Sequence, residues 1–172
     1  KRGAVHEALG REALAGGWRI SAGQHFTRAA LCYHFGKFMF VHKPDEMKRT
    51  HAKVVECRGL ALPLIDPPGE RVGMPYEGKH LYGILRKPSG AARPPVVILC
   101  VGLDSTKEEL GAYEDILLAR GMATLTFDGP GQGEGEYDFA IRGDYEAAVK
   151  AVADFIETRS DLDAGRVGLW GV

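Results

Sequence analysis

An unbroken apolar run at residues 95–101 constrains the fold of this chain more than any other segment. A run of this length, apolar on both faces, is typical of a central strand in a parallel sheet. Residues 122–127 and 167–170 are predicted to be further strands, with helices at residues 107–120 and 145–159. Strands that alternate with helices predict an α/β domain with a mostly parallel sheet covered on both faces.

A hairpin is expected ahead of this alternation. Residues 71–77 and 78–86 alternate apolar and polar side chains, as two paired strands do. The turn between them is expected at Glu77-Gly78 or at Gly78-Lys79, because glycine accepts the left-handed backbone of tight hairpin turns.

Residues before this point carry helical signals and almost no strand signals. Gly16-Gly17 is expected to end a first helix, Ser21 to cap a second whose apolar face extends to Val41, and Pro44 to open a third. We therefore predict two domains: a helical domain over residues 1–69 and an α/β domain over residues 70–172.

Composition excludes several classes of protein. The net charge of the 172 residues is −1, and the scattered Lys and Arg form no basic stripe, so no nucleic-acid partner is expected. The apolar runs are far shorter than the roughly 20 residues that span a bilayer, so no membrane association is expected. Three separated cysteines, Cys32, Cys57 and Cys100, are expected to be buried reduced thiols, which predicts a cytoplasmic protein.

The loop after the run at residues 95–101 is the first candidate for chemistry. Ligands of open α/β sheets bind beyond the carboxyl ends of the strands, and backbone N–H groups there can stabilise an oxyanion. We select the Leu103 N–H as the donor and Asp104 as a group that orients the substrate or acts as an acid or base. The alternatives are an ordinary strand–helix loop and a solvated aspartate. The next residues contain a helix capping box, formed by Ser105 with Glu108 or by Thr106 with Glu109.

The glycine-rich segment at residues 127–134 is expected to be a sharp turn beside the site. Its glycines match neither nucleotide-binding pattern, G-x-x-x-x-G-K-[ST] or G-x-G-x-x-G. Asp128 is expected to accept hydrogen bonds from backbone N–H groups of the loop.

The histidines form no metal-binding pattern, so no metal site is predicted. His34 stands between aromatic residues on an apolar helix, where it either lines a pocket or belongs to the helical core. Tyr33, His34 and Phe38 are the residues that we select as substrate-binding.

The final residues, 165–172, predict a buried strand that ends in a glycine turn. Gly171 and Val172 resemble the first two positions of G-x-S-x-G, the nucleophile elbow of α/β-hydrolases, and the serine would come next. The expectation is that the chain is the N-terminal part of a hydrolase, cut one residue before its nucleophile.

Residues 102–109, 120–124 and 127–134, together with the helical residues 29–35, resemble one α/β-hydrolase group. This group includes the 2,6-dihydroxypseudooxynicotine hydrolase, the fungal polyketide chain-shortening hydrolases and the fermentation–respiration switch esterase. The resemblance implies a helical cap over an α/β-hydrolase core, a Ser-Asp-His triad, and no metal or organic cofactor. It also implies, by similarity to the nicotine-pathway member, hydrolysis of a carbon–carbon bond beside a ketone. That member has a glutamate where this chain has Asp104, and the shorter side chain argues against the same substrate.

The function expected from these observations is that of a serine hydrolase acting on a small-molecule carbonyl or ester substrate. The triad is expected beyond Val172, so residues 1–172 alone are expected to be inactive. The alternative is a hydrolase-fold protein without catalysis that acts as a binding or regulatory partner. A homodimer is one of the assemblies left open.

Overall fold

The computed structural model describes residues 1–171 of the chain. The chain divides into two compact units, Lys1–Pro68 and Gly69–Val172, which are described separately below. Within residues 1–171, none of the helices combines the length and the apolar character needed to cross a membrane.

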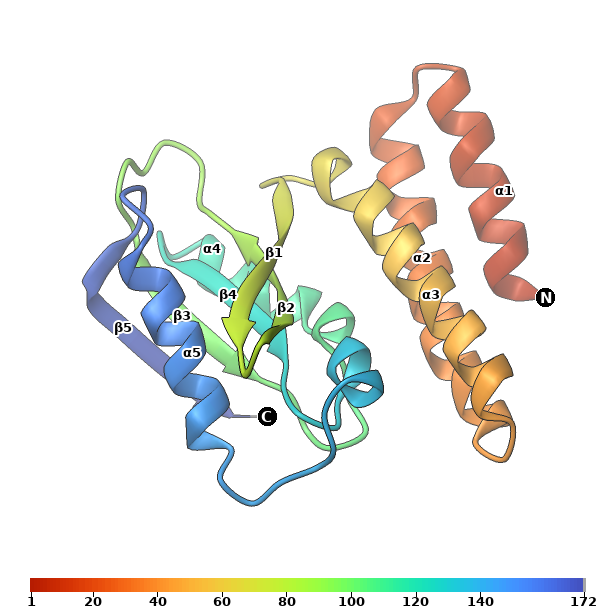
Figure 1. Ribbon diagram of the computed structural model, residues 1–172. Coiled ribbons are helices and arrows are strands. Elements are labelled where there is room, and N and C mark those ends of the chain that lie inside the picture. The colour runs from red at the N-terminus through yellow and green to blue at the C-terminus, as the bar shows by residue number, and fades with distance from the viewer. Residues whose placement is uncertain (172) are drawn as a thin grey trace. The chain divides into compact units, whose positions relative to one another are not determined.

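The first unit is helical and consists of three helices joined by tight turns (Figure 1). Its elements are α1 (Arg2–Ala15), α2 (Arg19–Lys37), the 3-10 turn η1 (Phe38–Phe40), α3 (Pro44–Ala61) and the 3-10 turn η2 (Leu62–Leu64). Small side chains let the helices approach closely: Ala13 and Ala22 pack with Phe26, and Ala29 packs with Cys57. Pro44 occupies the first turn of α3, as expected from the fixed φ of proline.

Two expectations for this unit are wrong. Ser21 does not cap α2, because the turn after α1 closes with the Trp18 N–H donating to the Ala13 carbonyl over 2.8 Å, and α2 begins directly at Arg19. The apolar face of α2 also stops short of Val41, because the helix ends at Lys37 and tightens into η1. Val41 is 59% exposed.

The second unit contains one five-stranded sheet in the order β1-β2-β4-β3-β5. Its strands are β1 (Gly69–Tyr76), β2 (Lys79–Arg86), β3 (Pro95–Cys100), β4 (Ala123–Asp128) and β5 (Asp163–Gly171). The pairs β4-β3 and β3-β5 are parallel, whereas β1 and β2 form an antiparallel hairpin that continues antiparallel onto β4. The hairpin turn is at Glu77-Gly78, where φ is +45° and +79°, as in the turn type that matches strand twist.

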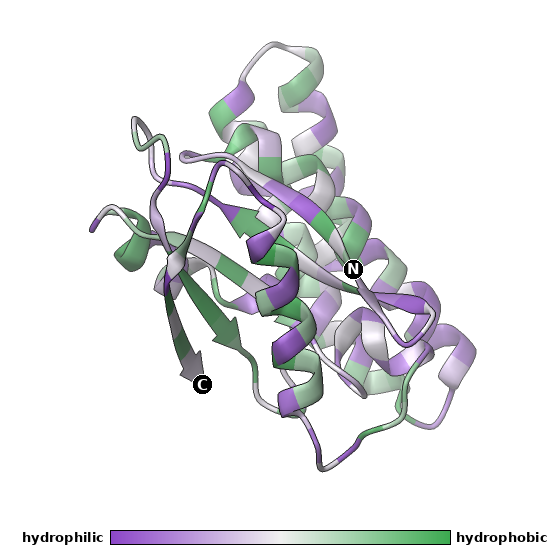
Figure 2. Ribbon diagram, turned by 60° about the vertical axis from the view of Figure 1, so that its left-hand side comes forward, coloured by the Kyte–Doolittle hydropathy of each residue, from purple (hydrophilic) through white to green (hydrophobic). Residues whose placement is uncertain are grey.

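Helices cover both faces of the sheet, as alternate side chains of β3 demonstrate. Val96 and Ile98 belong to the core beneath α5 (Glu146–Glu157), whereas Leu99 lies in the cluster beneath α4 (Gly111–Leu118). In Figure 2, α5 carries both hydrophilic and hydrophobic residues along its length, and its buried residues belong to this core. The helix expected over residues 107–120 is shorter and begins as a 3-10 turn, η3 (Lys107–Glu109).

The last strand lies at one edge of the sheet among the described residues. It begins at Asp163, four residues before the start predicted from sequence. Its Val167, Leu169 and Trp170 are 40% or more exposed, so the expectation of a buried strand is wrong for the described residues, in which β5 pairs with β3 on one side only. Val172, the second residue of the expected elbow, lies outside the described residues.

Candidate functional site

A cavity of about 310 Å³ lies at the carboxyl ends of β3 and β5, where open α/β sheets bind their ligands. Cys100 and Gly171, the last described residues of these two strands, form its base. The rest of the wall is mostly apolar, with two polar side chains, and consists of Val101, Leu103, Pro130, Gln132, Ile141, Arg142 and Tyr145. The cavity therefore suits an organic molecule with a substantial apolar part.

Leu103 and Asp104 lie at the tip of a turn beside this cavity. The Ser105 N–H donates to the Gly102 carbonyl over 3.1 Å and closes the turn. Leu103 lines the cavity with a side chain that is 62% exposed, and Asp104 is also exposed. Among residues 1–171, none accepts a hydrogen bond from the Leu103 N–H. This N–H thus belongs to a residue that lines the cavity and has no acceptor among these residues.

The Gln132 side chain joins the loop after β3 to the loop after β4. Its Nε2 donates to the carbonyls of Val101 and Gly102, each over 2.9 Å. Its Oε1 accepts from the Gly129 N–H at 3.0 Å and from the Tyr145 hydroxyl at 2.7 Å. Gln132 is only 4% exposed, so these bonds form in a largely dry environment, where they are stronger than in water.

A buried ion pair makes a second connection between the same loops. The Lys107 Nζ lies 2.6 Å from Asp128 Oδ2, and the Lys107 N–H donates to Asp128 Oδ1 over 2.8 Å. Asp128 Oδ2 also accepts from the Glu134 N–H at 3.0 Å, which confirms that Asp128 binds backbone N–H groups of its loop. Burial alone would lower the pKa of the Lys107 ammonium, but its carboxylate neighbours raise the pKa well above its usual range.

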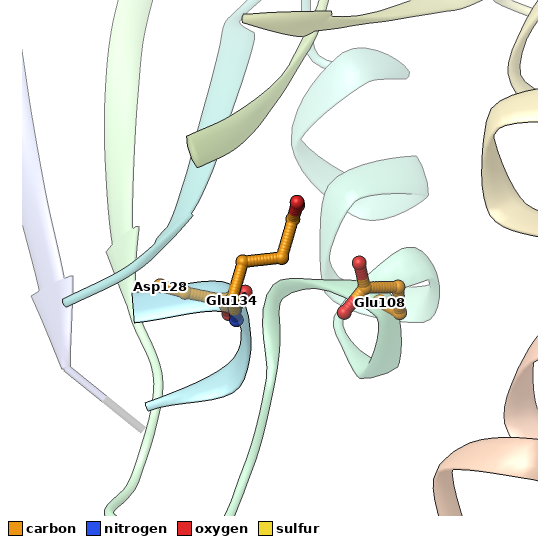
Figure 3. Close-up of side chains that lie close together, drawn as sticks. All are labelled: Glu108, Asp128 and Glu134. Carbon is orange, nitrogen blue, oxygen red and sulfur yellow. Dashed lines mark hydrogen bonds between the residues drawn. The ribbon is translucent and has the colours of Figure 1, made fainter. Parts of the chain in front are cut away.

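Three carboxylates surround this lysine. Figure 3 shows Glu108, Asp128 and Glu134, whose nearest oxygens lie within 4.8 Å of one another. Such a cluster can hold a metal ion, but the Lys107 Nζ lies 2.6 to 2.9 Å from an oxygen of each carboxylate. The ammonium therefore occupies the position that a cation would take. Arg71 neutralises Glu134 further through two hydrogen bonds of 2.6 and 3.1 Å.

The capping box predicted after the loop is present in one of its two forms. The Thr106 side chain and Glu109 cap each other across η3, with the Thr106 N–H donating to Glu109 Oε1 over 3.0 Å. Ser105 does not pair with Glu108 as the other form requires. Its hydroxyl donates to Glu109 at 2.8 Å, because Glu108 is turned toward Lys107.

The three residues selected as substrate-binding all belong to the helical unit. The Tyr33 hydroxyl donates to Glu7 over 2.9 Å, and burial together with this carboxylate raises the pKa of Tyr33 to about 12. His34 is buried, with its ring edge-on to Phe38, which is 37% exposed. The role of Tyr33, His34 and Phe38 in substrate binding stays a prediction.

The three cysteines are free thiols, as expected, but only Cys57 is fully buried. Cys32 and Cys100 are half-buried, so the expectation of three buried thiols is wrong for two of them. Burial raises the pKa of the Cys100 thiol to about 11, which keeps it protonated and unreactive near neutral pH.

Sequence analysis missed Gln132 and Lys107. Gln132 was treated as part of a turn, and Lys107 as part of a helix cap. A signal for Lys107 was present, since Asp128 ends β4 and Lys107 lies in the loop region after β3, the parallel neighbour of β4, and the carboxyl ends of parallel strands meet at one edge of a sheet. No sequence pattern indicates which backbone groups a glutamine in such a loop will bind.

A sheet that is parallel over β4-β3-β5, follows a β1-β2 hairpin, and has helices on both faces defines the N-terminal part of an α/β-hydrolase core. The chain belongs to the FrsA-like esterase family, whose profile, "Esterase FrsA-like", matches residues 8–172.

Two relatives and one solved structure illustrate the similarity. The chain is 37% identical to the 2,6-dihydropseudooxynicotine hydrolase of Paenarthrobacter nicotinovorans over 96% of this chain and 45% of that one. It is 33% identical to the hydrolyase poxO of Penicillium oxalicum over 96% of this chain and 43% of that one. The crystal structure of the 2,6-dihydroxy-pseudo-oxynicotine hydrolase superimposes with a TM-score of 0.90 at 36% identity, covering 99% of this chain and 48% of the other. The chain thus spans less than half the length of these relatives.

Proposed function

We propose that the full-length protein is a serine hydrolase that cleaves an ester bond, or a carbon–carbon bond beside a ketone, in a small molecule. The observation that carries the proposal is the Leu103 N–H, which has no acceptor among residues 1–171 and lies beside a cavity bounded by Gly171. In this proposal Gly171 and Val172 open the nucleophile elbow, and the serine follows them.

In the proposed mechanism the serine attacks the substrate carbonyl carbon and a negative charge develops on the carbonyl oxygen. The Leu103 N–H and the N–H of the residue after the serine donate to this oxygen. One such donor is worth about 3 to 4 kcal/mol of transition-state stabilisation. Asp104, exposed at the tip of the same turn, orients the substrate. The triad histidine takes the serine proton and gives it to the leaving group, which is an alcohol from an ester or, if a carbon–carbon bond is cut, a carbanion stabilised by an adjacent carbonyl group. Water then hydrolyses the acyl group from the serine.

The helical unit has the role of a cap in this proposal, with residues 1–69 closing over the core and Tyr33, His34 and Phe38 contacting the substrate. Named relatives of this chain include the 2,6-dihydropseudooxynicotine hydrolase and the 20-hydroxy-prefusarin hydrolase, which supports a small-molecule substrate, and the esterase family profile supports an ester. A reducing cytoplasmic location is part of the same proposal and rests on the three free thiols.

The test is fluorophosphonate labelling of the full-length protein, with peptide mapping of the labelled residue. We expect one label, on a serine directly after Val172, and turnover of either p-nitrophenyl esters or a simple β-diketone. A folded full-length protein that takes no label and turns over neither probe would instead be the non-catalytic binding partner.

A further inference from the structure

The hydrogen bonds of Gln132 use its side-chain amide completely. The two N–H bonds of Nε2 point to two carbonyls, and the two lone pairs of Oε1 receive an N–H and an O–H. These partners determine the orientation of the amide. If Nε2 and Oε1 were exchanged, the NH2 group would face the Gly129 N–H, and the amide oxygen would face the Val101 and Gly102 carbonyls. A glutamate of the same size could not replace it, since an ionised carboxylate donates no hydrogen bond.

One of the two carbonyls belongs to the peptide unit that bears the Leu103 N–H. The Gly102 carbonyl accepts from Gln132 Nε2 at 2.9 Å and from the Ser105 N–H at 3.1 Å. The peptide bond is planar and trans, so its N–H points opposite to its C=O. The two donors that fix the direction of the Gly102 carbonyl therefore also fix the direction of the Leu103 N–H, which points the opposite way from the same peptide plane.

Rotating this peptide would break both hydrogen bonds at once. The Ser105 N–H closes the four-residue turn over residues 102–105 and is one restraint on the Gly102 carbonyl. The Gln132 donor adds a restraint from outside the turn. The amide is itself anchored by Gly129 and Tyr145, which lie after β4 and just before α5.

We propose that Gln132 is a positioning residue that keeps the Leu103 N–H directed at the reacting oxygen. This inference rests on the proposed function, in which Leu103 supplies an oxyanion donor. It assigns to Gln132 an effect on the chemical step, because preorganised donors act on the charge that develops in the transition state more than on the bound substrate.

The experiment compares Gln132→Met and Gln132→Glu with wild type in the full-length protein, using p-nitrophenyl butyrate. Methionine keeps the length of the side chain and removes the donors. We expect kcat to fall about tenfold or more for both variants, toward the roughly 10²- to 10³-fold loss seen when an oxyanion donor is deleted, with KM changed less than about threefold.

The control is Thr126→Val, which removes a buried hydroxyl from β4 that reaches the Ile84 carbonyl over 3.4 Å. Thr126 lies on β4, the strand that precedes the Gln132 loop, and it makes no hydrogen bond to the Gly102 peptide. The kcat of this variant is therefore expected within about twofold of wild type. The pH profile adds a second readout. The carboxyl group that Gln132→Glu introduces regains one donor when it is protonated, so the ratio of variant to wild-type kcat is expected to rise as the pH is lowered.

The outcomes separate the inference from the function beneath it. A wild-type protein that hydrolyses the ester and takes up fluorophosphonate, with both Gln132 variants retaining wild-type kcat, overturns the inference alone. A wild-type protein that does neither overturns the proposed function.

A measurement on the wild-type protein covers the case in which the variants fail to fold. A crystal structure of the fluorophosphonate adduct is expected to place a phosphonyl oxygen about 2.7 to 3.1 Å from the Leu103 nitrogen, with Gln132 bound to the Gly102 carbonyl. An adduct in which that oxygen is bound while the Gln132 contact is absent would contradict the inference.

Discussion

Replacing Lys107 by methionine tests the buried ion pair that connects the loops after β3 and β4. The Lys107 and Asp128 side chains are each 1% exposed or less, with Nζ and Oδ2 2.6 Å apart. Removing the ammonium leaves Asp128 and Glu108 as buried carboxylates that face one another. Breaking a buried pair in this way costs about 3 to 5 kcal/mol, whereas native proteins are stable by about 5 to 15 kcal/mol in all.

The assay is urea denaturation of the full-length protein, with the free energy of unfolding obtained by linear extrapolation. The matched control is Lys79→Met, which breaks an ion pair with Asp138 of nearly the same length, 2.7 Å, between half-exposed side chains. That control should cost less than about 1 kcal/mol. The double variant Lys107→Met/Asp128→Asn should recover part of the loss, because it also removes the buried negative charge of Asp128. A loss below about 1 kcal/mol for Lys107→Met, equal to the control, would refute the reasoning.

Three further predictions concern the same unit and its neighbour. Gly133→Ala should lower the melting temperature markedly, because φ is +46° and the new Cβ would collide with the carboxylate of Asp128. The control, Gly59→Ala, places its Cβ in open space on α3 and should raise the free energy of unfolding by up to about 1 kcal/mol. Burial works against the ionised form of Glu134, but hydrogen bonds from its cationic neighbours lower its pKa from 4.5. Its contribution is therefore present above about pH 4.5 and lost as the pH falls further, so Glu134→Gln should make the free energy of unfolding, measured by urea denaturation, fall less steeply below about pH 4.5. Iodoacetamide should modify Cys100 slowly at about pH 8 in the folded protein, judged by mass spectrometry, because burial raises its pKa to about 11; rapid modification would contradict this.

The elements of the second unit could be predicted because each has a local signal. The apolar run at residues 95–101 contains β3, and the glycine at Gly78 determines the hairpin turn. The end of the turn after α1 could not be predicted from Ser21, because the competing contact is a backbone bond from Trp18 to Ala13. The end of α1 itself has a sequence signal in Gly17, whose φ of +79° lets the Trp18 N–H reach the Ala13 carbonyl.

The candidate site was predictable only in part. Leu103 and Asp104 were selected from their position after a strand, and the structure places both at the tip of that loop. Gln132 was missed because its importance depends on two carbonyl groups about 30 residues away in sequence. Every residue type has the same backbone carbonyl. The residues that Gln132 binds could therefore be of any type, and their identity in the sequence gives no sign of the contact.

The loops around the cavity are anchored at their bases and free at their tips. The anchors, Gln132 and Lys107, are almost fully buried, whereas the Leu103 and Ile141 side chains are 62% and 64% exposed. Exposed positions tolerate substitution with little cost in stability. New substrates could thus be acquired in evolution by exchanging tip residues one at a time, while the buried connections made by Gln132 and Lys107 stay intact. One scaffold can in this way serve relatives named for a nicotine-derived compound and for fungal products.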